Sequence, residues 1–318
     1  MPELPEVQTI ISDLNKKIRG DTITDFWSDW GKTIKGKSVE HFRKEIKNRK
    51  ILGARRIGKN IFIDLAGNKT LYIHLKMTGH LLVKFEIRNP KFETNSKSRN
   101  SKFKKNNYFS DKVNQYIHHI WKLKSGRTLE FSDLRKFGKI VFDDTDKINN
   151  LKEIKNLGID AMDPKFTFQK FSDILIRRKK SPIGLVLMDQ SLISGIGNIY
   201  RSEILFDSKI LPTRKISDIT EREKKYLYNS IKKILKKAIK YRGTSDSDYR
   251  DTSGASGSYQ KIMLVYRRSS QKCKRCGTII TRKKIGQRSV LVVSNAKYNF
   301  FNLFFVNYKI KIVICKGI

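Results

Sequence analysis

The stretch DQSLISGIGNIYRSEILF, residues 189–206, has apolar segments on both sides of a Gly-Ile-Gly-Asn turn. Gly195 and Gly197 lack a Cβ, so the backbone of the turn can approach another group closely. Asn198 is suited to cap the helix that follows and to donate to a phosphate, because a helix N-terminus has unpaired N–H groups. The alternative interpretation is an ordinary helical hairpin, since two glycines and a capping Asn alone do not prove a ligand.

Helical patterns lie on both sides of this turn. Downstream, Thr220 and Glu223 have the spacing of a capping box. One apolar face follows, with lysines opposite it: Leu227, Ile231, Ile234, Leu235 and Ala238. Upstream, Ser181 and Pro182 predict a helix start, with Ser181 as N-cap and Pro182 at the first helical position. The lysine face could follow phosphates, although a solvated face is an equally good interpretation.

The N-terminal half has a different pattern, with short β-branched and aromatic runs between turn residues. We expect strands at 61–65, 70–75, 116–123, 127–131 and 139–142. A helix is predicted before them over 4–18, because apolar residues recur at helical spacing there: Val7, Ile10, Ile11, Leu14 and Ile18. The polar, basic segment 90–113 is interpreted as an inserted surface loop. Together these patterns predict an α+β fold.

The charge of the chain predicts a polyanionic partner. The 318 residues include 68 Lys+Arg and 30 Asp+Glu, a formal net charge of +38, and nucleic acid is the commonest such partner. A lysine-rich composition of the kind that AT-rich genomes produce accounts for part of this excess. The start MPELPEVQTI has no signal-peptide pattern, and no apolar run reaches the roughly 18 residues of a membrane span. Three cysteines argue against a disulfide framework, so we expect an intracellular, cytoplasmic or nucleoid-associated protein.

The N-terminus contains a candidate nucleophile. Removal of Met1 would expose Pro2 as a secondary amine, and an α-amino group with a pKa near about 8 is partly neutral at physiological pH. An amine that attacks a sugar C1′ forms a Schiff base. Glu3 and Glu6 are close in sequence and could supply general acid–base catalysis. The competing interpretation is that Pro-Glu-Leu-Pro-Glu simply begins a helix.

Two further segments, HLKMTG (74–79) and SDLRKFG (132–138), place basic and apolar side chains at a strand end or turn. An Arg beside a Phe suits insertion into a base stack, where a flipped base leaves a gap to fill. For Met77 and Phe137, the alternative interpretation is core packing.

The segment CKRCG (273–277) is typical of a zinc knuckle. A complete ribbon needs a second ligand pair roughly 15–20 residues later, but that window, VVSNAK (292–297), contains no Cys or His. Cys315 is the only later cysteine, and no His follows His119. Cys273 and Cys276 are therefore candidate ligands of a structural Zn²⁺ whose second pair is missing, and the alternative is a ribbon that has lost its metal.

The motifs follow one another in an order that is typical of one protein family. PELPEV, RRIGKNIFIDL, HLKMTG, SDLRKFG and DQSLISGIGNIYRSEILF together resemble the formamidopyrimidine-DNA glycosylase / endonuclease VIII family, over residues 2 to about 289. The loop DYRDTSGASGSYQ (248–260), which leads into CKRCG, resembles the formamidopyrimidine branch. The tail 291–318 departs from the family pattern and suggests a frameshift, readthrough or divergent end.

The resemblance implies a set of domains. They are an N-terminal β-sandwich with flanking helices (1–145), a linker (146–165), a helix–two-turn–helix domain with a lesion-recognition loop (166–260) and a zinc-finger-like hairpin (261–290). It also implies a bifunctional DNA glycosylase/AP lyase of base excision repair. Such an enzyme removes 8-oxoguanine and formamidopyrimidines through a Schiff base and β,δ-elimination. The alternative is a non-catalytic or degenerate damaged-DNA-binding protein.

The resemblance also implies roles for the catalytic residues. Pro2 matches the Schiff-base nucleophile, Glu3 the general acid that opens the sugar, and Glu6 a supporting carboxylate. Lys59 matches a lysine that holds a phosphate beside the lesion, and His74 resembles a further phosphate contact.

For DNA binding, Met77, Arg135 and Phe137 match the trio that fills the void left by the flipped base. Asn198 and Arg288 match phosphate-binding residues of the helix–two-turn–helix and of the finger. The implied partner is double-stranded DNA with oxidised bases or abasic sites. The protein is expected to be a monomer and to have no membrane partner. The implied cofactor is a structural Zn²⁺, with none for catalysis.

Overall fold

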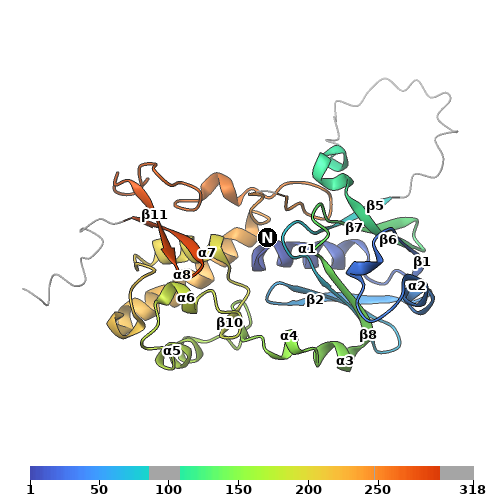
Figure 1. Cartoon of the computed structure of the whole chain (residues 1–318), viewed down its shortest axis with the longest axis horizontal. Coiled ribbons are helices and arrows are strands. Elements are labelled where there is room, and N and C mark those ends of the chain that lie inside the picture. Colours follow the sequence, from blue (N-terminus) through green and yellow to red (C-terminus); the bar gives the residue numbers. More distant parts are fainter. Residues whose placement is uncertain (86–107, 247, 294–318) are drawn as a thin grey trace, which may run out of the picture.

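The computed structural model describes residues 1–85, 108–246 and 248–293. Two four-stranded antiparallel sheets form the N-terminal half (Figure 1). The first has the order β1 (Ile23–Ser28), β6 (Ile117–Leu123), β7 (Arg127–Ser132) and β5 (His80–Phe85). The second has the order β2 (Ile51–Ile57), β3 (Asn60–Leu65), β4 (Lys69–His74) and β8 (Lys139–Asp144). Each strand predicted from the sequence is present, and β1, β2 and β5 are additional.

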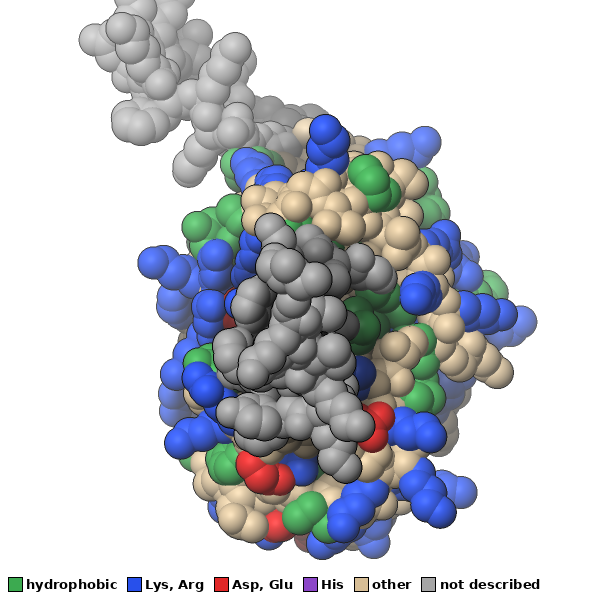
Figure 2. All heavy atoms as spheres, turned by 90° about the vertical axis from the view of Figure 1, so that its left-hand side faces the viewer, with side chains coloured by type: hydrophobic (Ala, Val, Ile, Leu, Met, Phe, Trp, Pro, Cys, Tyr) green, Lys and Arg blue, Asp and Glu red, His purple; other side chains and the backbone are tan. Residues whose placement is uncertain are grey.

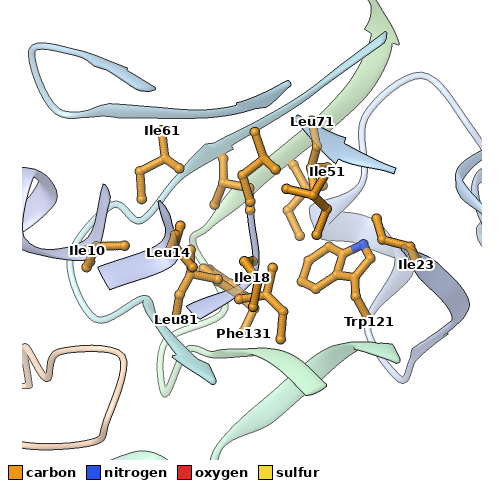
Figure 3. Packing of buried hydrophobic residues seen from close by; sticks show 14 of the residues in the cluster. Ile10, Leu14, Ile18, Ile23, Ile51, Ile61, Leu71, Leu81, Trp121 and Phe131 are labelled. Carbon is orange, nitrogen blue, oxygen red and sulfur yellow. The ribbon is translucent and has the colours of Figure 1, made fainter. Parts of the chain in front are cut away.

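The core of this half lies between the two sheets and α1 (Leu4–Lys17). Figure 3 shows Ile10, Leu14 and Ile18 pointing toward side chains of both sheets. All the apolar residues predicted for this helix are buried, so its helical spacing is confirmed. A second helix, α2 (Val39–Ile46), closes one end by packing Phe42 against Phe26, with the ring centroids 4.6 Å apart.

The C-terminal half is helical. Two short helices, α3 (Thr145–Asn149) and α4 (Lys152–Lys155), lead to it, and a two-stranded parallel pair, β9 (Ile159–Asp160) with β10 (Ile193–Ser194), lies at its entrance. Its helices are α5 (Phe168–Ile176), α6 (Ile183–Val186), α7 (Asn198–Asp207) and α8 (Glu221–Lys240). The predicted capping box of α8 is present, and its predicted apolar face is buried. Single-turn 3-10 helices occur at Gly31–Thr33, Tyr108–Ser110, Lys112–Gln115, Ile216–Asp218 and Tyr259–Ile262.

Two predicted helix starts were wrong by one residue. α6 begins at Ile183 with Pro182 as N-cap, because Pro182 has an extended ψ of 135° and pairs with Lys215 as a β-bridge. Ser181 is therefore outside the helix. α7 begins at Asn198 with Gly197 as N-cap, so Asn198 is the first helical residue and does not cap it.

The last described residues form a β-hairpin of β11 (Ile280–Ile285) and β12 (Arg288–Val293), which we call the finger hairpin. It lies over α7 and α8 in Figure 1. Figure 2 views this end of the molecule, and Lys and Arg side chains are spread over the visible face. Of the predicted insertion 90–113, residues 90–107 lie outside the described residues, as does the tail after 293 with Cys315, whereas 108–113 include the 3-10 helix Tyr108–Ser110 and the start of the next one. Within the described ranges, no helix is long and apolar enough to span a membrane.

Candidate active site and DNA interface

The N-terminus of α1 meets the N-terminus of α7, where the two halves join (Figure 1). Pro2 and Glu3 are both buried there. The Glu3 carboxylate accepts backbone N–H bonds from Gly197 (2.8 Å), Ile199 (2.9 Å) and Tyr200 (3.4 Å). The unpaired N–H groups and the positive dipole end of α7 therefore hold a carboxylate next to Pro2.

The two glycines of the turn make this approach possible. A Cβ on Gly197 would lie 2.3 Å from Glu3 carboxyl atoms, and one on Gly195 would lie 2.5 Å from the Leu4 side chain. Gly195 also has a left-handed φ of 104°. The sequence predicted that the backbone approaches some group closely here, and that group is the N-terminus of the same chain.

Glu6 lies beneath Glu3 and is fully buried. It accepts from the backbone N–H of Glu3 (2.7 Å), from that of Thr244 (2.7 Å) and from the Tyr200 hydroxyl. Burial raises the pKa of Glu6 to about 7, and the neighbouring Glu3 carboxylate adds to this rise. A carboxyl with this pKa can take up or release a proton near neutral pH. Tyr200 and Thr244 were not predicted, because they are distant from Glu6 in sequence.

Lys59 and His74 line a cavity of about 320 Å³, together with Met1, Tyr72 and Lys139. Burial lowers the pKa of Lys59, and the Glu3 and Glu6 carboxylates oppose this effect. Burial, reinforced by nearby lysines, lowers the pKa of His74 to about 4, so its imidazole is neutral at pH 7. The His74 Nδ1 accepts from the Lys76 N–H (2.9 Å), which leaves Nε2–H as a donor. The cavity thus offers a cation and a neutral donor beside the N-terminus.

Met77, Arg135 and Phe137 come together from two separate loops. The Arg135 guanidinium lies 4.6 Å from the centroid of the Phe137 ring and 3.1 Å from the Met77 sulfur. Met77 is 45% exposed and Phe137 is 54% exposed, so the core-packing interpretation is wrong for both. An exposed apolar and guanidinium cluster of this kind suits insertion between bases.

A buried carboxylate holds these two loops in place. Asp133 accepts from the Thr78 hydroxyl and from the backbone N–H groups of Arg135 (3.3 Å) and Gly138 (2.7 Å). Lys136 lies between Arg135 and Phe137 in the sequence and has a left-handed φ of 56°. Its ammonium lies 4.3 Å from the centroid of the Trp30 ring. None of these supporting residues was predicted from the sequence.

A buried arginine connects Asn198 to β12, the strand on which Arg288 lies. The Asn198 Oδ1 accepts from Arg201, which is fully buried and also donates to the Ser289 carbonyl of β12 (3.0 Å). Burial lowers the pKa of Arg201 to about 10, and the Arg288 charge contributes. The Arg288 charge also lowers the pKa of Lys59. The Arg288 charge therefore acts both on α7 and on the cavity that Lys59 lines.

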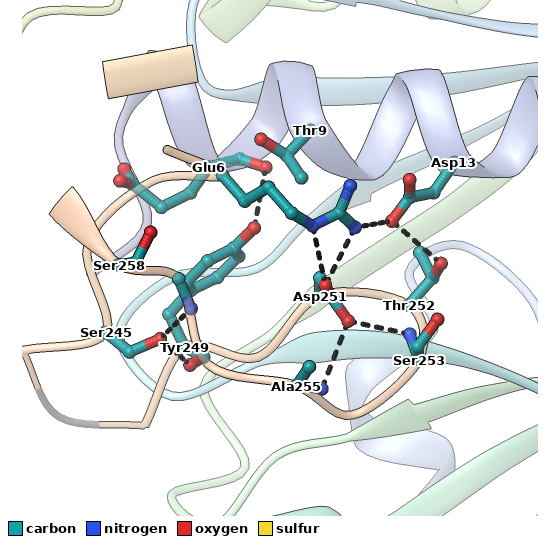
Figure 4. A network of polar contacts seen from close by, with 12 residues as sticks. Glu6, Thr9, Asp13, Ser245, Tyr249, Asp251, Thr252, Ser253, Ala255 and Ser258 are labelled. Atoms are coloured by element: carbon teal, nitrogen blue, oxygen red, sulfur yellow. Dashed lines mark hydrogen bonds and ion pairs between the residues drawn. The ribbon is translucent and has the colours of Figure 1, made fainter. Parts of the chain in front are cut away.

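The loop from 244 to 258 is held against α1 by a network that Figure 4 shows. The Arg242 guanidinium lies between Asp13 of α1 and Asp251 of the loop, 2.9 Å from Asp251 through Nε. Asp251 in turn accepts from the backbone N–H groups of Ser253 (2.9 Å) and Ala255 (3.1 Å). This network was not predicted, and it connects the loop to the helix that begins at the site.

The candidate zinc ligands do not form a complete site in the described residues. Cys273 is buried in an apolar cluster and Cys276 is partly buried. No group of three or more His, Cys, Asp or Glu side chains that could hold a metal occurs in the described part of the chain. Structural zinc almost always has four ligands, so the residues present do not fit it.

Two family profiles match the chain. One is described as the formamidopyrimidine-DNA glycosylase N-terminal domain and matches residues 1–140, and the other as the formamidopyrimidine-DNA glycosylase H2TH domain and matches residues 157–249. A relative named formamidopyrimidine-DNA glycosylase from Pelotomaculum thermopropionicum is 36% identical over 291 residues, which cover 91% of this chain and 96% of the relative.

Solved structures show the same similarity. The Lactococcus lactis Fpg in complex with DNA containing an abasic site is 27% identical with a TM-score of 0.74, and the match covers 92% of this chain and 97% of that one. A complex of the same bacterial protein with DNA containing an oxidised pyrimidine has a TM-score of 0.74 and 27% identity over 92% and 98% of the chains. The chain therefore belongs to the formamidopyrimidine-DNA glycosylase family.

Proposed function

We propose that this protein is a bifunctional DNA glycosylase and AP lyase that removes 8-oxoguanine and formamidopyrimidines from double-stranded DNA. The enzyme class follows from the family, and the observation that carries the chemistry is the buried Glu3 carboxylate, held by α7 beside Pro2. Met1 lines the cavity that contains Lys59 and His74. Removal of Met1 would therefore place a free Pro2 amine at this cavity.

The reaction begins when the Pro2 nitrogen attacks the sugar C1′. The bond from C1′ to the damaged base breaks, the base leaves with the bonding electrons and is protonated, and the Pro2 nitrogen loses its proton. Glu3 is placed to protonate the sugar ring oxygen as the ring opens, which leaves an iminium between Pro2 and C1′. Glu6, with a pKa of about 7, supports proton transfer at the same place.

The iminium makes the C2′ protons acidic. Loss of one C2′ proton expels the 3′ phosphate, and a second elimination expels the 5′ phosphate, so the strand is cut on both sides of the sugar. Lys59 lines the cavity and is placed to hold a phosphate beside the lesion.

DNA binding uses the surfaces on either side of the cavity. The exposed Met77, Arg135 and Phe137 fill the gap that the flipped nucleotide leaves, which offsets the lost stacking. His74, Asn198 and Arg288 hold phosphates and so position the lesion without reading the sequence.

Two substrates separate the two activities. On a duplex with 8-oxoguanine, Pro2→Gly and Glu3→Gln should both lose strand cleavage. On a duplex with a preformed abasic site, Pro2→Gly should be slowed but not abolished, because it replaces the secondary amine of proline by a primary amine that can still form a Schiff base. Glu40→Gln, an exposed residue of α2, is the matched control and should cleave like the unchanged protein. Tight binding of both duplexes without cleavage by the unchanged protein would favour a non-catalytic DNA-binding protein.

A further inference from the structure

The finger hairpin needs a support other than four zinc ligands. After Asp251 the sequence contains no Asp, Glu or His, and Cys315 is the only cysteine beyond Cys273 and Cys276. The segment after Asp251 therefore supplies at most three of the four ligands that structural zinc requires. The hairpin is nevertheless well formed, with all six residues of β11 paired in register with β12.

One side chain of α7 holds the segment that leads into the finger. Glu203 is 2% exposed, and its carboxylate accepts three consecutive backbone N–H bonds. The donors are Leu264, Val265 and Tyr266, each at 2.9 Å. Hydrogen bonds to an ionised acceptor are roughly twice as strong as neutral ones. Three of them on one buried carboxylate fix the direction of the chain just before the cysteine pair.

A second contact holds the cysteine turn itself. Arg275, which lies between Cys273 and Cys276, stacks 4.4 Å from the centroid of the Phe206 ring on α7. Its guanidinium donates to the Phe206 carbonyl (3.3 Å) and to the Asp207 carboxylate (3.3 Å). The turn that would hold zinc in a complete ribbon is therefore attached to the end of α7 by an arginine.

The third contact reaches the strand that carries Arg288. Arg201 donates to the Ser289 carbonyl, the residue next to Arg288. An apolar cluster fills the space between hairpin and helix, with Phe206, Val265, Cys273, Ile280 and Val293 buried in it. Cys273 behaves here as a small apolar side chain, which buried free cysteines commonly do.

We propose that the finger hairpin folds and presents Arg288 to DNA without a metal ion. In this arrangement the contacts from α7 stabilise the hairpin in place of zinc coordination. Glu203 is the positioning residue in this arrangement, because it orients the segment from which the hairpin starts. The proposal rests on the proposed function in one respect, that the protein binds DNA. It involves no catalytic step.

The first measurement is the metal content of the full chain, purified from cells grown with added zinc. Inductively coupled plasma mass spectrometry should find zinc far below one ion per chain. The melting temperature should be unchanged by excess EDTA, and so should the affinity for a duplex with a tetrahydrofuran analogue of the abasic site, which cannot form a Schiff base and is not cleaved. About one zinc per chain, with a melting temperature that falls on chelation, would overturn the proposal and would point to Cys315 as a third ligand.

The second measurement tests Glu203 through the salt dependence of DNA binding. The plot of log affinity against log salt has a slope of about −0.9 for each phosphate contacted. Arg288→Ala should reduce the slope by about one unit. Glu203→Gln should reduce it equally and weaken binding by about tenfold, whereas Cys273→Ala with Cys276→Ala should keep the slope.

The matched control is Glu223→Gln, another buried carboxylate of the helical half, which is paired with Arg214 at the start of α8. It should lower the melting temperature without changing the slope, because it does not contact the finger. A Glu203→Gln protein with an unchanged slope, or a double cysteine variant that loses the Arg288 contact, would contradict the proposal. These readouts are independent of strand cleavage, so an inactive enzyme would not affect them.

Discussion

At the scale of single residues, the site depends on buried carboxylates that hydrogen bonds keep in place. The sequence predicted Glu3 and Glu6 as acid–base candidates from their position beside Pro2. It could not predict their partners, because the donors at 197–200 and at 244 are about 200 residues away in the chain. Only the fold brings these donors to α1, whereas the glycines that permit the approach are visible in the sequence.

Glu6 should make stability depend on pH. Its folded pKa of about 7 lies above the unfolded value of 4.5, so the folded state binds the proton more tightly. The stabilisation is complete below pH 4.5 and is lost as the pH rises through 7. Denaturant titrations should therefore show that Glu6→Gln loses less stability at pH 7.5 than at pH 5. A difference of the order of 2–3 kcal/mol between the two conditions is expected. Equal losses at both pH values would contradict the assignment.

Gly197 should not tolerate a side chain. Its φ is ordinary, so only the contact with Glu3 opposes a Cβ. Gly197→Ala should cost about 1–3 kcal/mol of unfolding free energy and should reduce cleavage of an abasic-site duplex. Gly53→Ala is the control, because a Cβ there meets Asn15 at an ordinary 3.4 Å. Thermal unfolding measures the loss of stability in both variants. Similar melting temperatures would show that Gly197 and the Glu3 carboxyl are not in tight contact.

At the scale of elements, α7 connects the N-terminus of the chain to the finger hairpin. Its N-terminus binds Glu3, Arg201 reaches β12, and Glu203 holds the segment before the finger. The periodicity of residues 189–206 predicted the helix and its turn. It did not predict this connecting role, because a buried Arg or Glu in a helix cannot be distinguished from an exposed one by spacing alone.

Trp30 should support the loop that carries Arg135 and Phe137. The Lys136 ammonium lies over its ring, and such a contact contributes about 0.5–1 kcal/mol at an exposed site. Trp30→Ala should weaken binding to a duplex with a non-cleavable tetrahydrofuran analogue of the abasic site about two- to fivefold. Trp27→Ala is the control, since Trp27 is exposed on the neighbouring β1. Fluorescence anisotropy compares the two, and equal affinities would exclude a supporting role.

At the scale of the whole molecule, the two halves are joined by ion pairs between residues that are distant in sequence. Arg56 of β2 pairs with Asp160 of β9, and Arg242 joins α1 to the loop from 244 to 258. The sequence predicted two halves of different structure and a cationic surface, and these follow from local pattern and composition. The joint between them depends on pairing across more than 100 residues, for which a single sequence carries no signal.

Arg242→Ala should loosen this joint. Asp13 and Asp251 are both buried and would lose their shared partner, while Arg242 itself is 46% exposed, so we expect a loss of about 1–3 kcal/mol. The control is Arg43→Ala, whose pair with Asp25 is exposed and should contribute little. Limited proteolysis should cut the loop from 244 to 258 faster in the Arg242→Ala protein than in the Arg43→Ala protein. Cleavage at the same rate in both variants would contradict this role.

The central claim is that Pro2, freed from Met1, is the nucleophile. Borohydride reduction during reaction with an 8-oxoguanine duplex converts a Schiff base into a stable covalent bond. Mass spectrometry of the trapped protein should place the DNA adduct on the N-terminal peptide, at Pro2, with Met1 absent. An adduct on Lys59, or no adduct although DNA is bound tightly, would contradict the account.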